Sequence, residues 1–123
     1  MAAMRATLEH VLTDDAFGLM ITLADRFTDG VRNVIDSRAL PWSIVQLGAR
    51  AEYRFSQRPP RSGGESHAAA DEALDEYLHL YLANRGVLIT PFHNMALMCP
   101  ATTDADVDVH SELFAAAADE LVG

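Results

Sequence analysis

The run from Arg85 to Thr103, RGVLITPFHNMALMCPATT, contains the side chains of this sequence that are best suited to bind or react with a ligand. Its centre places Pro91, Phe92, His93 and Asn94 between two short apolar stretches that we predict to be strands. An imidazole, a carboxamide and an aromatic ring would then meet at one strand edge. Loops held by rigid strands are where binding groups collect. On spacing alone, this segment is either a binding loop or an ordinary connection.

The acidic residues near the C-terminus do not predict a metal site. Asp104, Asp106 and Asp108 resemble the start of a calcium loop, which also needs glycine at position six and glutamate at position twelve. Those positions hold Val109 and Ala115. We therefore interpret the three aspartates as an acidic helix N-terminus, where carboxylates interact favourably with the helix dipole.

The histidines and the single cysteine likewise predict no zinc site, because no pair of them has ligand spacing. Cys99 lies in an apolar run, and we interpret it as a small core residue and not as a nucleophile. Nucleophile-elbow and phosphate-loop motifs do not occur in the sequence. The sequence thus contains none of these catalytic or metal-binding motifs.

Helical periodicity dominates the first third of the chain. Residues 2–12 are predicted to form a short helix. Thr13 is a predicted N-cap for a long amphipathic helix that ends near Ser37. Its apolar stripe recurs at intervals of three and four residues and comprises Phe17, Met20, Ile21, Ala24, Phe27, Val31, Val34 and Ile35.

A hairpin is predicted next, with strands at 42–47 and 50–55 joined by Gly48 and Ala49. The second strand alternates between an apolar face and a face carrying Arg50, Glu52 and Arg54. Residues 56–67, SQRPPRSGGESH, are predicted to be a surface loop.

The rest of the chain predicts a helix at 71–84, strands at 87–89 and 95–99, and a final helix capped by Thr103 with Asp106 at N3. The inner stripe of that final helix is predicted to be Val107, His110, Phe114, Ala117 and Leu121. Strand pairs alternating with helices indicate an α+β fold with a small, largely antiparallel sheet and helices packed on it.

Composition limits the classes of partner. The chain has 123 residues, is 50% hydrophobic and carries a net charge of −9, so we expect one domain that binds neither nucleic acid nor an anionic membrane. One cysteine and no apolar leader lead us to expect a cytoplasmic protein. All nine basic residues are arginine, and lysine is absent.

Residues 84–110, NRGVLITPFHNMALMCPATTDADVDVH, resemble the C-terminal segment of class III pyridoxal-phosphate aminotransferases. The similarity is greatest to the branch that holds glutamate-1-semialdehyde aminomutases and β-phenylalanine-type transaminases. The resemblance extends over essentially the whole chain. It implies that residues 13–123 form the small C-terminal domain of a fold-type I enzyme. Residues 1–12 would end a helix that belongs to, or links to, a large domain.

The resemblance also implies what this segment does and lacks. Such enzymes transfer an amino group from an amino acid to a 2-oxo acid, work as homodimers, and hold pyridoxal 5'-phosphate through a lysine Schiff base on the large domain. This chain has no lysine, so we expect it to bind no cofactor and to be inactive by itself. A β-amino acid or an aromatic amino acid is an expected donor.

The resemblance places the substrate pocket at Pro91, Phe92, His93, Asn94 and Met95. Asn94 aligns with a glutamate of the aminomutases, which favours transamination of an amino acid with a bulky apolar side chain.

Arg85 is the nearest arginine that could hold a substrate carboxylate, although its position also suits a helix end. One alternative is a stand-alone α+β binding or dimerisation module without catalysis, and another is a small metal-independent enzyme that uses His93. If the chain is a fragment, we expect it to self-associate through the first two helices or the hairpin.

Overall fold

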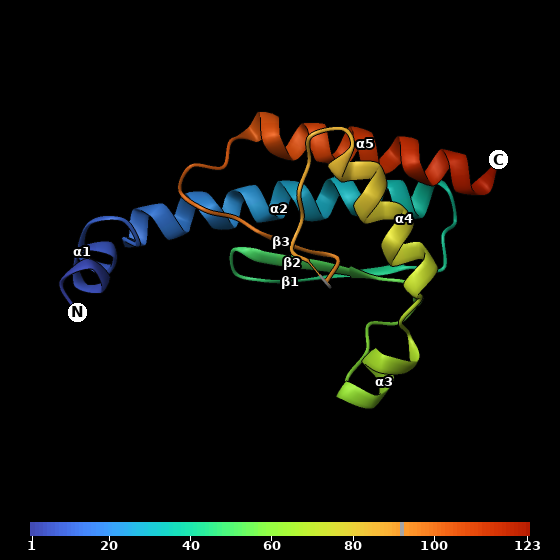
Figure 1. Ribbon diagram of the computed structural model, residues 1–123, viewed down its shortest axis with the longest axis horizontal. Helices are drawn as coiled ribbons and strands as arrows, with labels where there is room; N and C mark the ends of the chain where they lie inside the picture. The colour runs from blue at the N-terminus through green and yellow to red at the C-terminus, as the bar shows by residue number, and fades with distance from the viewer. Residues whose placement is uncertain (92) are drawn as a thin grey trace.

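The computed structural model describes residues 1–91 and 93–123, and it forms two layers. Its elements are, in order, α1 (Ala2–His10), α2 (Asp14–Ser37), β1 (Ser43–Leu47), β2 (Arg50–Arg54), α3 (Gly63–Ala68), α4 (Glu72–Ala83), β3 (Met95–Leu97) and α5 (Asp104–Val122). Helices α2 and α5 lie side by side over one face of the sheet, and α4 crosses beside them (Figure 1). The expected α+β fold is confirmed.

The sheet is fully antiparallel, with strand order β1-β2-β3. Leu47 pairs with Arg50, which leaves the predicted two-residue turn between β1 and β2. Gly48 begins this turn with φ of +57°, a left-handed conformation that glycine adopts without steric cost. Residue 52 of the middle strand pairs with Val45 on one side and with Met95 on the other.

The two faces of the sheet differ because side chains alternate along each strand. Ala51 and Tyr53 are fully buried beneath the helices. Arg50, Glu52 and Arg54 point to the opposite face. Among the described residues, no helix packs along that face (Figure 1). We call it the open face, and it carries Ser43, Val45, Leu47, Arg50, Glu52, Arg54, Met95 and Leu97.

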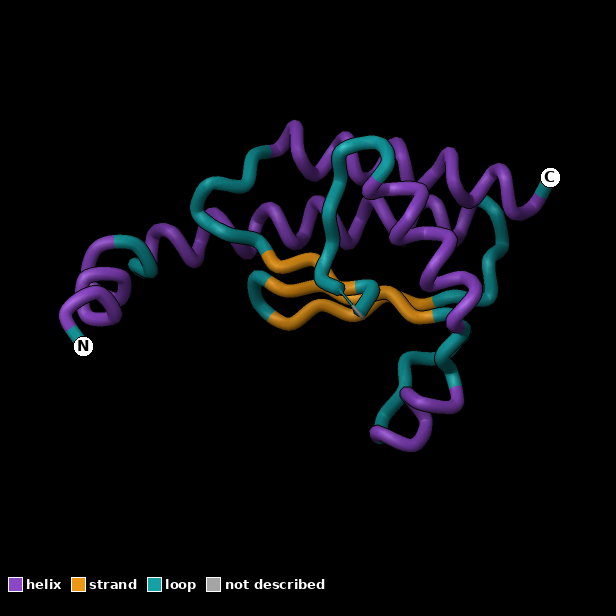
Figure 2. The backbone as a smooth tube through the Cα atoms, in the orientation of Figure 1, coloured by secondary structure: helices purple, strands orange, loops and turns teal. Residues whose placement is uncertain are grey.

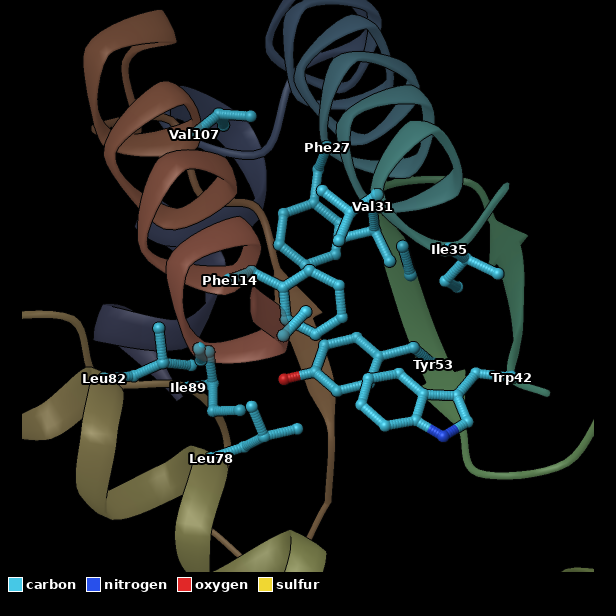
Figure 3. Close-up of a cluster of buried hydrophobic side chains, with 14 of the residues drawn as sticks. Phe27, Val31, Ile35, Trp42, Tyr53, Leu78, Leu82, Ile89, Val107 and Phe114 are labelled. Atoms are coloured by element: carbon cyan, nitrogen blue, oxygen red, sulfur yellow. The ribbon is translucent and has the colours of Figure 1, made fainter. Parts of the chain in front are cut away.

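The core lies between the helical layer and the buried face of the sheet (Figure 3). Phe27 and Val31 of α2 meet Phe114 of α5, whose ring centroid lies 4.9 Å from that of Tyr53. Trp42 closes one end against Phe114 at 6.0 Å. These contacts fix the position of the sheet relative to the helices.

Capping side chains begin the long helices where the sequence predicts. The Thr13 hydroxyl accepts a hydrogen bond from the Ala16 N–H at the start of α2. Thr103 and Asp106 form a complete capping box at the start of α5. The predicted inward stripe of α2 is partly wrong, since Phe17 is 45% and Ile21 39% exposed. Both lie on the N-terminal half of α2, which extends beyond the sheet (Figure 1).

Two strand predictions need correction. Residues 87–89 form no strand, because the Val87 N–H bonds to the Leu82 carbonyl at the end of α4 and only Ile89 is buried. Figure 2 shows this segment as loop. The strand predicted at 95–99 ends at Leu97, since the Cys99 N–H instead donates to the Thr102 hydroxyl.

Three single assignments are also wrong. Cys99 is exposed and not a core residue, because the chain turns outward after β3. Leu121 is 40% exposed at the last turn of α5. The stretch at 56–67 is not all loop, because residues from Gly63 onward form a short helix, α3, which Ser62 caps by accepting a hydrogen bond from the Glu65 N–H.

Helix α1 buries none of its residues. That residues 1–12 end a helix of a large domain stays a prediction. None of the helices in the described part of the chain has the length and apolar character needed to cross a bilayer.

Candidate functional site

The connection between α4 and β3 forms the predicted binding segment. At the end of α4, Gly86 adopts φ of +88° and the Val87 N–H donates to the Leu82 carbonyl at 3.0 Å, so the chain reverses direction. Ile89 is buried and anchors the returning segment in the core. Beyond it, the Thr90 N–H bonds to the Met95 carbonyl at 3.2 Å, which closes a short loop at the start of β3.

Asn94 anchors this loop to two other elements. Its side chain is 3% exposed, and its amide nitrogen donates to the Asp75 carboxylate on α4. Its backbone carbonyl accepts from the Tyr53 N–H at 3.0 Å, which extends the pairing of β2 beyond β3. The loop is therefore held to α4 and to the middle strand at once.

The Asp75 carboxylate also acts on Tyr53. Burial, and after it the charge of Asp75, raises the pKa of the Tyr53 phenol, which therefore stays protonated. Among the described residues the phenol oxygen has no hydrogen-bond partner. Tyr53 thus serves the core and supplies no proton at neutral pH.

The other predicted pocket residues differ in exposure. Pro91 is exposed and lines a shallow hollow with Asp75, Glu76 and His79. The His93 side chain is half exposed, and Met95 is partly buried at the start of β3. Phe92 lies outside the described residues. Pro91, His93 and Asn94 thus lie in one loop, with Asn94 turned inward, and Met95 follows it as the first residue of β3.

Arg85 lies at the end of α4 and already has partners there. Its guanidinium carbon lies 3.5 Å from the centroid of the Tyr81 ring, and its Nη1 donates to the Tyr81 carbonyl at 3.2 Å. These contacts account for an arginine at this helix end. A carboxylate-binding role for Arg85 stays a prediction.

A charged cluster beside the loop was not among the predicted site residues. Glu52 is only 7% exposed, and its Oε1 lies 3.0 Å from Arg54 Nη2 and 3.4 Å from His93 Nδ1. Its Oε2 accepts from Arg50 Nη2 at 3.4 Å. Alternation along β2 places the three charged residues on one face. No local pattern, however, places His93 beside them, because it is far away in sequence.

Two kinds of cofactor can be compared with the residues present. In the described part of the chain, no group of three or more His, Cys, Asp or Glu side chains could hold a metal ion. Pyridoxal phosphate is held through a lysine in the enzymes that use it, and this chain has none. This chain therefore supplies no side-chain amine for a Schiff base with that cofactor.

Solved structures are similar to almost the whole of this chain. Two crystal structures of a glutamate-1-semialdehyde aminomutase from Pseudomonas aeruginosa are each 50% identical to it over 98% of its length, with a TM-score of 0.95. One of them is a variant with a lysine replaced by alanine, in complex with PMP. An omega-transaminase from Sphaerobacter thermophilus is 23% identical over 91% of this chain, with a TM-score of 0.73, and shares the fold.

The chain spans 26% of the length of each of these structures. No protein-family model and no curated protein matches the sequence.

Proposed function

Because this chain belongs to the class III pyridoxal-phosphate aminotransferases and has the fold of their C-terminal small domain, we propose that it closes over the substrate of such an enzyme. The enzyme would transfer an amino group from an amino acid to a 2-oxo acid. A large domain outside this chain would supply the lysine and hold pyridoxal phosphate, which provides an aldehyde that accepts the amino group. Residues 1–12 would pack against that domain.

The observation that carries this proposal is the anchored loop between Thr90 and Met95, in a fold that matches the aminomutase structures over 98% of the chain and the omega-transaminase over 91%. Catalytic groups must be held in fixed geometry, and a loop tied to α4 and β2 meets that need. In this role Pro91, Phe92, His93 and Met95 contact the substrate. Asn94 acts as a positioning residue, because it holds the loop to Asp75.

Transamination is favoured over aminomutase chemistry by the surroundings of Asn94. The resemblance places a glutamate at this position in aminomutases. Here a glutamate would set a second carboxylate against Asp75 in a buried place, which is costly. The donor would be an amino acid with a bulky apolar side chain. We propose that the enzyme is a homodimer.

The test is to produce this segment together with the large domain that precedes it and to assay the purified protein. We expect cofactor absorbance and transfer of an amino group to 2-oxoglutarate or pyruvate. The 123-residue chain with added pyridoxal phosphate is the control and should be inactive, because it lacks lysine. A stand-alone binding module predicts no transfer in either sample, and that result would refute the proposal.

A further inference from the structure

We propose that Arg54, positioned by Glu52 and lying beside His93, binds the carboxylate of the amino-acid substrate. This inference rests on the proposed function and names a residue for it. Arg54 lies on β2 and His93 lies in the loop before β3, so the two come together only in the folded chain.

The geometry brings the Arg54 and His93 side chains to one oxygen of Glu52. Glu52 Oε1 lies 3.0 Å from Arg54 Nη2 and 3.4 Å from His93 Nδ1. Arg54 therefore reaches the side of Glu52 that faces the substrate loop. Arg50 contacts the other carboxylate oxygen, Oε2, and pairs with Leu97, away from the start of β3.

Arg54 retains donors for a ligand. A guanidinium carries five N–H donors in a planar fork that fits a carboxylate. Nη2 lies 3.0 Å from Glu52 Oε1, but among the described residues that oxygen has no hydrogen-bond partner, so the ion pair is a contact of charges and leaves the guanidinium fork available. The side chain is 24% exposed, so these donors are partly shielded from water, which strengthens their attraction for an anion.

The charge of the surroundings suits an anion as well. The whole chain carries −9, whereas the open face holds two arginines and a single acid, Glu52. Glu52 neutralises part of this positive charge. In exchange, its charge attracts the Arg54 guanidinium to this position, which lowers the entropy lost when a ligand binds.

The neighbours of the cluster suit the apolar part of such a substrate. In the sheet register Glu52 lies between Val45 and Met95. Val45 is 44% exposed and Met95 is partly buried, so both offer apolar surface near the charged cluster. An amino acid with an apolar side chain has this combination of features. Arg85, by contrast, is already engaged by Tyr81.

The test uses the complete enzyme and two donors that differ in one group. β-Phenylalanine carries a carboxylate, and 1-phenylethylamine has the same ring and amine without it. The rate of cofactor conversion is measured without an acceptor, so that only the donor's carboxylate is tested. The variants are Arg54→Gln, Arg54→Lys and, as a charge-matched control on the outer surface of α2, Arg32→Gln, whose partner is Asp29 at 2.9 Å.

For Arg54→Gln we expect the apparent dissociation constant of β-phenylalanine to rise about 10- to 100-fold, with 1-phenylethylamine changed less than about threefold. For Arg54→Lys, the dissociation constant of β-phenylalanine should lie between those of the wild type and Arg54→Gln, because a lysine keeps the charge but loses the planar fork. Arg32→Gln should leave both donors unchanged. If Arg54→Gln weakened the binding of both donors equally, or of neither, the assignment would be overturned. If Arg54→Gln does not fold, the same comparison on Arg54→Lys decides.

A binding measurement separates this inference from the proposed function. Titration calorimetry with 3-phenylpropanoate, which has the carboxylate but no amine to transfer, needs no turnover. We expect wild-type binding that Arg54→Gln weakens about 10-fold or more. An enzyme without transferase activity that still shows this difference refutes the proposed function and keeps the carboxylate site. An active enzyme that binds 3-phenylpropanoate equally well with and without Arg54 refutes the carboxylate site and keeps the proposed function.

Discussion

The amide nitrogen of Asn94 donates a hydrogen bond to the carboxylate of Asp75, and this contact joins the loop before β3 to helix α4. Asn94 is 3% exposed, so neither water nor a charged neighbour can easily replace the pairing.

Asn94→Asp should destabilise the protein by about 2–3 kcal/mol, because it removes a buried donor and places two carboxylates together. Asp75→Asn combined with Asn94→Asp restores one donor and one acceptor, and should recover much of the loss. Urea unfolding at neutral pH measures both changes. A double variant no more stable than the Asn94→Asp variant would show that the contact is not what holds the loop.

Gly86 controls how the chain leaves α4. Its φ of +88° is unfavourable for any residue with a Cβ, so Gly86→Ala should cost about 1–2 kcal/mol, although nothing lies within 4 Å to clash. Gly18→Ala is the control, because Gly18 lies in α2 with open space around it and should gain up to about 1 kcal/mol. Thermal unfolding of the two variants should show opposite shifts. Shifts of the same sign would contradict a left-handed Gly86.

His110 makes stability depend on pH. Burial lowers its pKa from 6.5 to about 4, and it lies between Phe27, at 4.5 Å, and Phe114, at 5.8 Å, measured between ring centroids. The pKa of His110 is lower in the folded state than in the unfolded state. Its contribution to the free energy of unfolding is therefore complete above pH 6.5 and is lost as the pH falls towards 4. A shift of this size corresponds to about 3 kcal/mol.

Urea unfolding of the wild type and of His110→Leu between pH 8 and pH 4 measures this contribution. Below pH 6.5 the free energy of unfolding of the variant should fall less steeply with decreasing pH than that of the wild type, whatever its stability at pH 8. Parallel curves for the two proteins would mean that His110 does not account for the pH dependence.

Phe114 is fully buried at the centre of the core. Phe114→Ala should cost about 3–5 kcal/mol, because it removes the contacts with Trp42 and Tyr53 and leaves a cavity. Leu88→Ala is the matched control, since Leu88 is 83% exposed and its truncation should change stability by less than about 0.5 kcal/mol. Comparable losses for the two variants in denaturant unfolding would contradict the described core.

Local signals account for the parts of the fold that sequence predicted well. Caps at Thr13 and Thr103 begin α2 and α5, and the glycine at 48 turns the hairpin. Each depends on residues within a few positions of one another. Hydrogen bonds over that range are fixed by residue type and spacing, so the sequence alone reveals them.

The features that the sequence did not predict depend on residues that are far apart in the chain. The apolar run at 87–89 indicates a strand, but Val87 is used to cap α4, and pairing with a distant strand cannot be read from three residues. The exposure of Cys99 depends on where β3 ends against β2. The cluster of Glu52, Arg54 and His93 joins residues about forty positions apart, which only the fold brings together.

The amino-transfer role is tested most directly by the absorbance of the cofactor in the complete enzyme. An amino-acid donor added without an acceptor should convert bound pyridoxal phosphate to its amine form, and a 2-oxo acid added afterwards should restore the first spectrum. Pure enzyme that binds no cofactor, or whose spectrum no amino donor changes, would contradict the role proposed for this chain.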